Sequence, residues 1–310
     1  MNTTNFWPEL SYGEGKETYD TIHMWTQIMG KIKLANMPWI NHSWHVTLLA
    51  TPYGLTTGVL PYKEKFFQIN LDFLKHQLQI TTSNNEERSY DLQSLSVSDC
   101  YHNIFTCLRS FSIDIAINPI PSELVDPIPF PLDDKHKTYN PKEAKALHLA
   151  LLNSSAVFTE FRSGFVGKSS PVHFFWGSFD LAVSRFSGRL APQHPGGVPN
   201  LPDWVAREAY SHEVYSCGFW PGNESFPQAA FYSYIYPEPE GFKEAAVNPS
   251  AGYYHRGLGE YVLPYEAVQK AANPSESLLD FLHSTYTVAA SLAKWDRKSL
   301  EKNFNNRGQK

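Results

Sequence analysis

Apolar residues recur every three or four positions in several stretches of the chain, which is the spacing of one face of a helix. In the first stretch, Ile22, Trp25 and Ile28 carry this pattern. Pro141 suits the first turn of another helix, because proline lacks the backbone N–H that this turn leaves unpaired. The predicted helices are 18–33, 98–111, 142–161 and 275–294.

Other stretches alternate between apolar and polar residues, as strands do when one face is buried. Residues 66–73 and 77–82 are separated by a short link and predict a hairpin. In 172–186 the period of two would place Trp176, Ser178 and Asp180 in one row on one face. The predicted strands are 44–51, 66–73, 77–82, 172–186, 208–219 and 229–236. Together these elements predict an α+β protein with antiparallel β-sheet and helices.

Six prolines between positions 119 and 141 predict a connector without regular structure, because proline removes backbone donors. We therefore expect an N-terminal α+β half at 1–118, the connector at 119–141, a C-terminal α+β half with a pocket at 142–297, and a polar tail at 298–310. Both halves show helix, Gly-Lys, strand, further strands and helix. The markers are Gly30-Lys31 with Trp44 and Gly167-Lys168 with Trp176, and they suggest an internal duplication.

Composition narrows the class of protein. Hydrophobic residues make up 42% of the 310 positions and charged residues 18%, which favours a compact globular chain over a disordered one. Aromatic residues reach 15%, an excess that fits a dense core or an aromatic-lined pocket. The net charge of −5 and the absence of a Lys/Arg stripe argue against nucleic-acid binding.

Cysteine usage and hydropathy indicate the compartment. Cys100, Cys107 and Cys217 form no disulfide framework, and the first two would share one helix face as buried thiols. No run approaches 18 apolar residues, so we expect no membrane span. The start of the chain has neither a basic segment nor an apolar one, so we expect no secretory signal and a soluble cytoplasmic protein.

The residues with the most chemistry gather in the C-terminal half. Asp180, His212 and Glu213 are candidate acid–base groups, because apolar neighbours can shift their pKa values. Tyr232, Tyr234 and Tyr236 would share one strand face and form an amphipathic wall that can stack on a ligand. The remaining candidate ligand-binding residues are Trp176, Ser178, Arg185, Arg189 and His194.

Several more specific sites are disfavoured by spacing. No HxH or HExxH pattern links the potential metal ligands, so no metal site is predicted; these residues are His173, Asp180, His194, His212 and Glu213. The chain has no Gly-x-Ser-x-Gly elbow, and Cys217 and His212 differ in strand parity. Gly167-Lys168-Ser169 is not a phosphate-binding loop, because Arg162 stands where that motif needs glycine.

Five segments of the chain are specific enough to compare with known families. They are Trp25-Thr26-Gln27-Ile28-Met29-Gly30-Lys31, Trp44-His45-Val46-Thr47, Ser170-Pro171-Val172-His173-Phe174-Phe175-Trp176-Gly177-Ser178-Phe179-Asp180, His194-Pro195-Gly196-Gly197 and Ser211-His212-Glu213. These segments resemble a bacterial family of unknown function, DUF5996. The resemblance runs from about Trp7 to Trp295 and suggests one full-length bacterial unit, but it implies no activity.

Three functions remain open at this point. The chain could be an enzyme that acts on a small polar metabolite by acid–base chemistry. It could instead bind a small molecule without converting it, as a sensor does. It could also be a structural protein that binds a partner through its aromatic residues, since interfaces favour Tyr, Trp and Arg. The sequence assigns neither a cofactor nor an oligomeric state.

Overall fold

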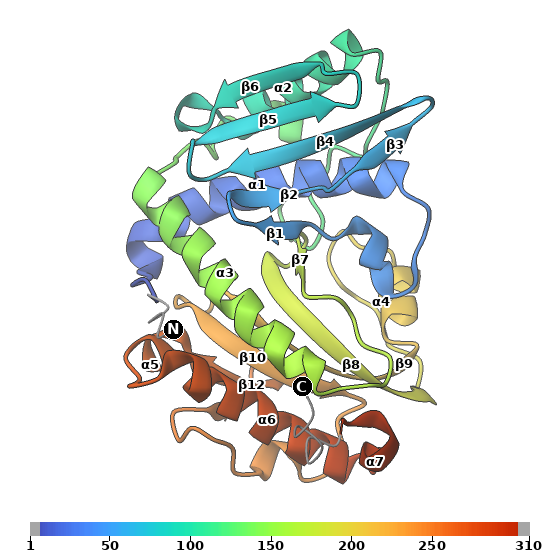
Figure 1. The fold of residues 1–310 in the computed structure, drawn as a ribbon, viewed down its shortest axis with the longest axis vertical. Helices are drawn as coiled ribbons and strands as arrows, with labels where there is room; N and C mark the ends of the chain where they lie inside the picture. The colour runs from blue at the N-terminus through green and yellow to red at the C-terminus, as the bar shows by residue number, and fades with distance from the viewer. Residues whose placement is uncertain (1–6, 303–310) are drawn as a thin grey trace, which may run out of the picture.

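The computed structural model describes residues 7–302. The remainder of the predicted polar tail, 303–310, lies outside the described residues, as do positions 1–6. Helices and two antiparallel sheets, each of six strands, confirm the predicted α+β class (Figure 1). The α-helices are α1 (Tyr12–Asn36), α2 (Val97–Ser110), α3 (Pro141–Ser163), α4 (Asp203–Ala209), α5 (Tyr265–Gln269), α6 (Pro274–Leu292) and α7 (Arg297–Leu300).

The first sheet has the order β1-β2-β4-β5-β6, with β3 paired to β4. Its strands are β1 (Leu49–Thr51), β2 (Gly54–Thr56), β3 (Leu60–Tyr62), β4 (Lys65–Asp72), β5 (Gln77–Thr82) and β6 (Glu87–Asp91). The second sheet has the order β11-β12-β10-β9-β8-β7. Its strands are β7 (His173–Phe175), β8 (Asp180–Leu190), β9 (His212–Trp220), β10 (Ala230–Tyr236), β11 (Tyr253–His255) and β12 (Glu260–Pro264).

Local chemistry explains where the predicted helices begin. Ser11 caps α1, and Ser96 with Asp99 forms a reciprocal capping box at the start of α2. Asn140 caps α3, with Pro141 in its first turn as expected. The helices predicted at 18–33, 98–111, 142–161 and 275–294 are thus confirmed as α1, α2, α3 and α6, and the hairpin predicted at 66–82 is β4–β5.

Two predicted strands are wrong. Residues 41–46 form a 3-10 segment, η1 (Asn41–Val46), in which His42 and Ser43 have left-handed backbones, so only Leu49–Thr51 of the strand predicted at 44–51 exists. The long strand predicted at 172–186 is instead the hairpin β7–β8, with a turn at 176–179. Trp176 and Ser178 therefore lie in the turn and not in a row with Asp180.

Contacts with the first half explain this turn. The Trp176 indole packs against Gly30 of α1, where a Cβ atom would collide with it, and its Nε1–H donates to the Val46 carbonyl at 2.9 Å. His23 lies 2.9 Å from the Gly177 carbonyl and stacks on Phe179. These tertiary contacts override the alternating pattern, which by itself favours a continuous strand.

The predicted strand 208–219 begins later than expected. Residues Asp203–Ala209 form α4, and β9 starts at His212. The strand predicted at 229–236 is confirmed as β10, and the three tyrosines share one face of it, as expected.

The two halves are joined by α1 and by a bridge between strands (Figure 1). Leu48 and Phe174 exchange two backbone hydrogen bonds of 2.9 Å, which link the first sheet to β7. Gly30 and Lys31 lie inside α1, and neither Trp44 nor Trp176 opens a strand. The internal duplication and the domain boundaries therefore stay predictions.

One face of the second sheet is covered by helices α3 and α6 (Figure 1). Phe158 and Phe161 of α3 pack there against rings such as Phe231 and Tyr215. The residues of the opposite face follow from the strand register, and we call it the tyrosine face. Its members on β8, β9, β10 and β12 are Asp180, Ala182, Ser184, Phe186, Val214, Ser216, Gly218, Trp220, Ala230, Tyr232, Tyr234, Tyr236, Glu260, Val262 and Pro264. The flanking strands β7 and β11 add His173, Phe175, Tyr253 and His255.

Candidate functional site

Asp180 begins β8 and lies at one end of the tyrosine face, where only 7% of it is exposed. Its carboxylate accepts a hydrogen bond from the Tyr232 hydroxyl, although β9 separates the two strands. Gly218 makes this possible, because a Cβ at that position would lie 2.5 Å from the Tyr232 hydroxyl oxygen. The missing side chain thus leaves room for the ring to cross β9.

A second set of hydroxyl groups follows along the same face. Ser184 and Ser216 lie opposite each other on β8 and β9, with their Oγ atoms 3.0 Å apart. The Tyr234 hydroxyl lies 2.8 Å from that of Tyr210, and the Tyr234 ring stacks parallel to Tyr232. The half-buried phenols and Ser184, with the buried Ser216 beneath them, make the middle of this face polar.

Three carboxyl groups surround these phenols. Burial, together with the charge of Glu123, raises the pKa of Asp180 to about 7, although the Tyr232 hydrogen bond opposes this shift. Burial and the charge of Asp180 raise the pKa of Glu260 to about 8. The pKa of Glu123 is also raised by burial, although the Ser178 hydroxyl donates to it at 2.5 Å. Carboxyls with pKa values near neutrality can both take and release protons at physiological pH.

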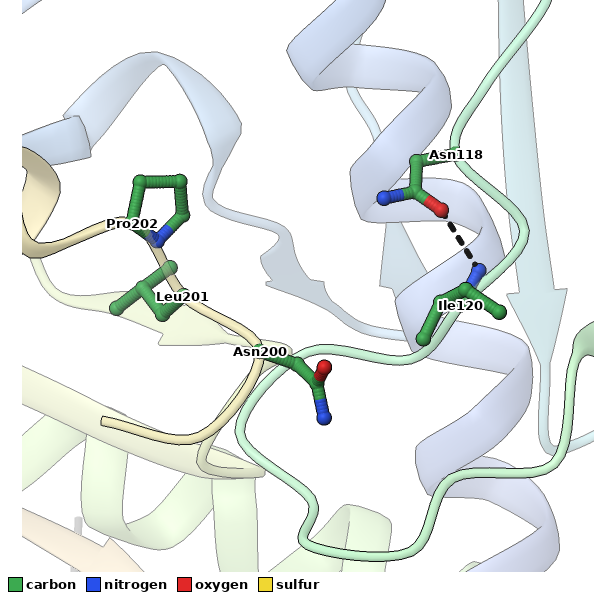
Figure 2. A pocket seen from close by; sticks show the side chains of 5 residues that line it. All are labelled: Asn118, Ile120, Asn200, Leu201 and Pro202. Carbon is green, nitrogen blue, oxygen red and sulfur yellow. Dashed lines mark hydrogen bonds between the residues drawn. The ribbon is translucent and has the colours of Figure 1, made fainter. Parts of the chain in front are cut away.

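The connector and the loop after β8 meet beside these carboxyls. The Glu123 N–H donates to the Pro199 carbonyl at 2.9 Å, and the Asn200 side chain donates to the Leu124 carbonyl at 2.7 Å. Between the same two segments lies a surface pocket of about 370 Å³ (Figure 2). It is lined by Asn118, Ile120, Asn200, Leu201 and Pro202, and none of the carboxyl or phenol groups contributes to it.

The other predicted site residues lie in different places. Arg185 is on the helix-covered face, where its guanidinium donates to the Phe161 carbonyl and lies against the Phe161 and Tyr286 rings. Arg189 forms an ion pair with Glu213 at 2.6 Å, and it donates to the Ala293 carbonyl just after α6. These contacts hold the end of β8 against α6 and keep both arginines away from Asp180.

Trp176 is buried between the two halves, as described above. His194 stacks on Tyr210 with 4.6 Å between ring centroids, and Tyr236 donates to the Pro192 carbonyl at 3.0 Å. His212, at the start of β9, lies near His42. Of the predicted residues, the structure brings Asp180, Ser178, Tyr232 and Tyr234 together. His194 is linked to them through Tyr210, on which it stacks and whose hydroxyl lies beside that of Tyr234.

Sequence reasoning missed three members of this cluster. Glu260 directly precedes the apolar run of β12, and an acid at the edge of such a run is the signal that could have found it. Tyr210 directly follows the helix α4, although it was predicted to lie within the strand 208–219. Glu123 lies in the proline-rich connector, where no pattern sets it apart.

Two further observations concern the part of the chain that the structure describes. Among residues 7–302, no group of three or more His, Cys, Asp or Glu side chains is placed so that it could hold a metal ion. No described helix combines the length and the apolar character needed to cross a bilayer. All three cysteines are free and buried.

Comparison with known proteins gives one match. No curated protein sequence and no solved structure is significantly similar to this chain. The model of DUF5996, described as a family of unknown function, matches residues 7–302. This match covers almost the whole chain, so the protein belongs to the DUF5996 family.

Proposed function

We propose that the protein binds a small polar molecule at the tyrosine face, and that Asp180 exchanges a proton with it. The observation that carries this proposal is the buried Asp180 carboxyl, held by the Tyr232 hydroxyl beside partly exposed phenols. Such a carboxyl is costly to bury, and structural sheets normally place apolar residues in this position. Active sites are where this cost is most often found.

The charge of the cluster favours one class of ligand. Glu123, Asp180 and Glu260 all carry carboxyls, and the tyrosine face contains no lysine or arginine. Phenol rings offer both a hydroxyl and the negative side of a π-system, which attracts cations. A molecule with amino or hydroxyl groups fits this surface, because both kinds of group can donate hydrogen bonds to the carboxyls and phenols.

Asp180 supplies the acid–base chemistry in this proposal. With a pKa of about 7, the carboxyl can accept a proton from a bound hydroxyl or ammonium group and return it later. The Tyr232 hydrogen bond stabilises the charged form after the proton has left. Glu260 is the second proton-exchanging group, in place of His212 and Glu213, which lie elsewhere.

A role in binding without catalysis is the second candidate. Ser184 and Ser216 are hydrogen-bonded to each other, and Cys217 points to the helix-covered face. Neither serine is therefore paired with a base that would activate it as a nucleophile. This arrangement suits a receptor for a polar ligand as well as it suits an enzyme without a covalent step.

A thermal-shift screen tests the site. The panel would contain small amines, sugars and carboxylates, each measured against wild type, Asp180→Asn, Tyr234→Phe and the exposed control Glu266→Gln. We expect amines or sugars to raise the melting temperature of wild type and of the control, and the two site variants to lose this effect. Hits that stabilise all four proteins equally would place the ligand elsewhere and refute the proposal.

Mass spectrometry of each hit after incubation then separates the two roles. Conversion of the ligand by wild type, lost in Asp180→Asn, identifies an enzyme. A ligand recovered unchanged identifies a binding protein.

A further inference from the structure

A second cluster lies at the opposite end of the tyrosine face, around Phe186. Phe186 is six residues from Asp180 along β8, which corresponds to about 20 Å. His42 stacks on the Phe186 ring with 4.4 Å between centroids, and the Lys168 Nζ atom lies 2.6 Å from His42 Nε2. This cluster therefore cannot share a small ligand with Asp180 and is independent of the function proposed above.

The hydrogen bonds of His42 define its protonation. Its Nδ1 atom lies 2.9 Å from the Ala209 carbonyl, which can only accept, so Nδ1 carries the proton. Nε2 is then left with a lone pair and accepts from Lys168. The Glu208 carboxylate accepts from the His42 backbone N–H at 2.8 Å and holds the left-handed turn in place. The imidazole is thus a fixed, neutral acceptor for the lysine.

The surroundings of Lys168 favour a reactive amine. The side chain is exposed at the surface, yet Nζ lies 5.0 Å from the centroid of the Phe186 ring and 5.6 Å from that of Trp44. Burial lowers the pKa of Lys168, while the charge of Glu208 opposes this. His212 is the remaining titratable group that faces His42. An accessible lysine with a neutral base in contact has the arrangement of an amine nucleophile.

We propose that Lys168 forms a Schiff base with a planar aldehyde or ketone. The Nζ lone pair attacks the carbonyl carbon, and the π electrons move to the oxygen. The two amine protons pass one after the other through His42 Nε2 to this oxygen, which leaves as water when the C=N bond forms. The products are one imine and one water, and no oxidant or reductant is needed. The half-buried Trp44 ring provides a flat surface against which a conjugated carbonyl compound packs.

Reductive trapping tests this proposal. The full chain is incubated with benzaldehyde and cyanoborohydride, and the modification of each lysine is followed by peptide mass spectrometry. Lys142 is the internal comparison, because its side chain is 83% exposed and lies beside an acid. Since a lowered pKa raises the neutral fraction of the amine, we expect Lys168 to react severalfold faster than Lys142 at pH 7.5.

Two variants and a pH series complete the experiment. Lys168→Arg keeps the positive charge but should lose the label at this position, and His42→Asn, which suits the left-handed backbone, should slow Lys168 relative to wild type because the proton relay is lost. The pH series uses wild type, so it does not depend on whether a variant folds. The labelling rate at Lys168 should level off at a lower pH than the rate at Lys142. Equal rates and equal pH midpoints for the two lysines would overturn the proposal.

Discussion

Gly218 and Tyr232 show how one missing side chain shapes the candidate site. The Tyr232 ring occupies the space above Gly218 and reaches Asp180 on the next strand but one. A Cβ at position 218 would also lie 2.5 Å from the Leu181 carbonyl oxygen, which belongs to the backbone and cannot move easily. The geometry of the acid–phenol pair thus depends on a residue that makes no hydrogen bond through a side chain.

Gly218→Ala should destabilise the protein by about 1–3 kcal/mol, because the new methyl group overpacks the face. Urea unfolding at equilibrium measures this change. Tyr232→Ala removes the ring that the new methyl group would meet. The double variant Gly218→Ala with Tyr232→Ala should therefore lose less unfolding free energy than the two single variants lose in sum. Additive costs would contradict the proposed steric coupling. Gly13→Ala serves as a control, because its Cβ would meet nothing within 4 Å.

Asp180→Asn should change how stability depends on pH. The pKa of Asp180 is raised from 3.8 to about 7, so the folded state binds the proton more tightly than the unfolded state does. The stabilisation that the protonated Asp180 carboxyl gives the folded state is therefore complete below pH 3.8 and is lost as the pH rises to about 7. The variant does not titrate there, and its stability relative to wild type should grow by on the order of 2–4 kcal/mol between pH 4 and pH 8.

Urea unfolding of both proteins across this pH range gives the difference directly. Tyr232→Phe provides a second check, because loss of its hydrogen bond should raise the pKa of Asp180 further and move the change to higher pH. A difference between Asp180→Asn and wild type that stays constant with pH would show that Asp180 titrates alike in both states.

At the level of elements, α1 is unusual because it buries lysines. Lys31 is 6% exposed and donates to the Ser122 hydroxyl at 3.0 Å, and Lys33 is 8% exposed and donates to the Thr47 carbonyl at 2.6 Å. Neither ammonium has a carboxylate within ion-pair distance among the described residues. Burial accordingly lowers the pKa of each to about 8.

Lys33→Met should remove part of the pH dependence at alkaline pH. Since the folded pKa of about 8 lies below the ordinary 10.5, the unfolded state binds more protons in this interval. The stability of wild type should therefore rise between pH 8 and pH 10, and the variant should lose on the order of 1–3 kcal/mol of that rise. Urea unfolding at both pH values measures this change in unfolding free energy. The same change with pH in wild type and in the variant would contradict the prediction.

At the level of the whole molecule, the two halves share one core. Trp7 contacts Phe231 and Tyr265 of the second half, and the Pro8 carbonyl accepts from the Tyr265 hydroxyl at 2.9 Å. Trp176 of the second half in turn packs on Gly30 of the first. These contacts run in both directions, so neither half is expected to unfold alone.

Gly30→Ala should therefore destabilise the whole chain in a single unfolding transition. The added methyl would displace the Trp176 indole and weaken its bond to Val46. We expect far-UV circular dichroism and tryptophan fluorescence to give the same lowered urea midpoint, which corresponds to a loss of unfolding free energy on the order of 1–3 kcal/mol. Separate midpoints for the two signals would show that the halves are independent units.

The sequence by itself determined the elements whose signals are local. The spacing of Ile22, Trp25 and Ile28, the proline at 141 and the alternation in 77–80 each depend on residues a few positions apart, and the corresponding helices and hairpin are present. The shared face of Tyr232 and Tyr234 also follows from the strand period alone.

The tertiary structure alone decided which residues meet. The alternation in 172–186 favours a continuous strand, but docking of Trp176 on α1 bends it into a hairpin. Glu123 reaches the cluster of Asp180 through the connector, a contact without any sequence period. Local patterns specify elements, whereas a site depends on long-range packing that brings distant side chains together.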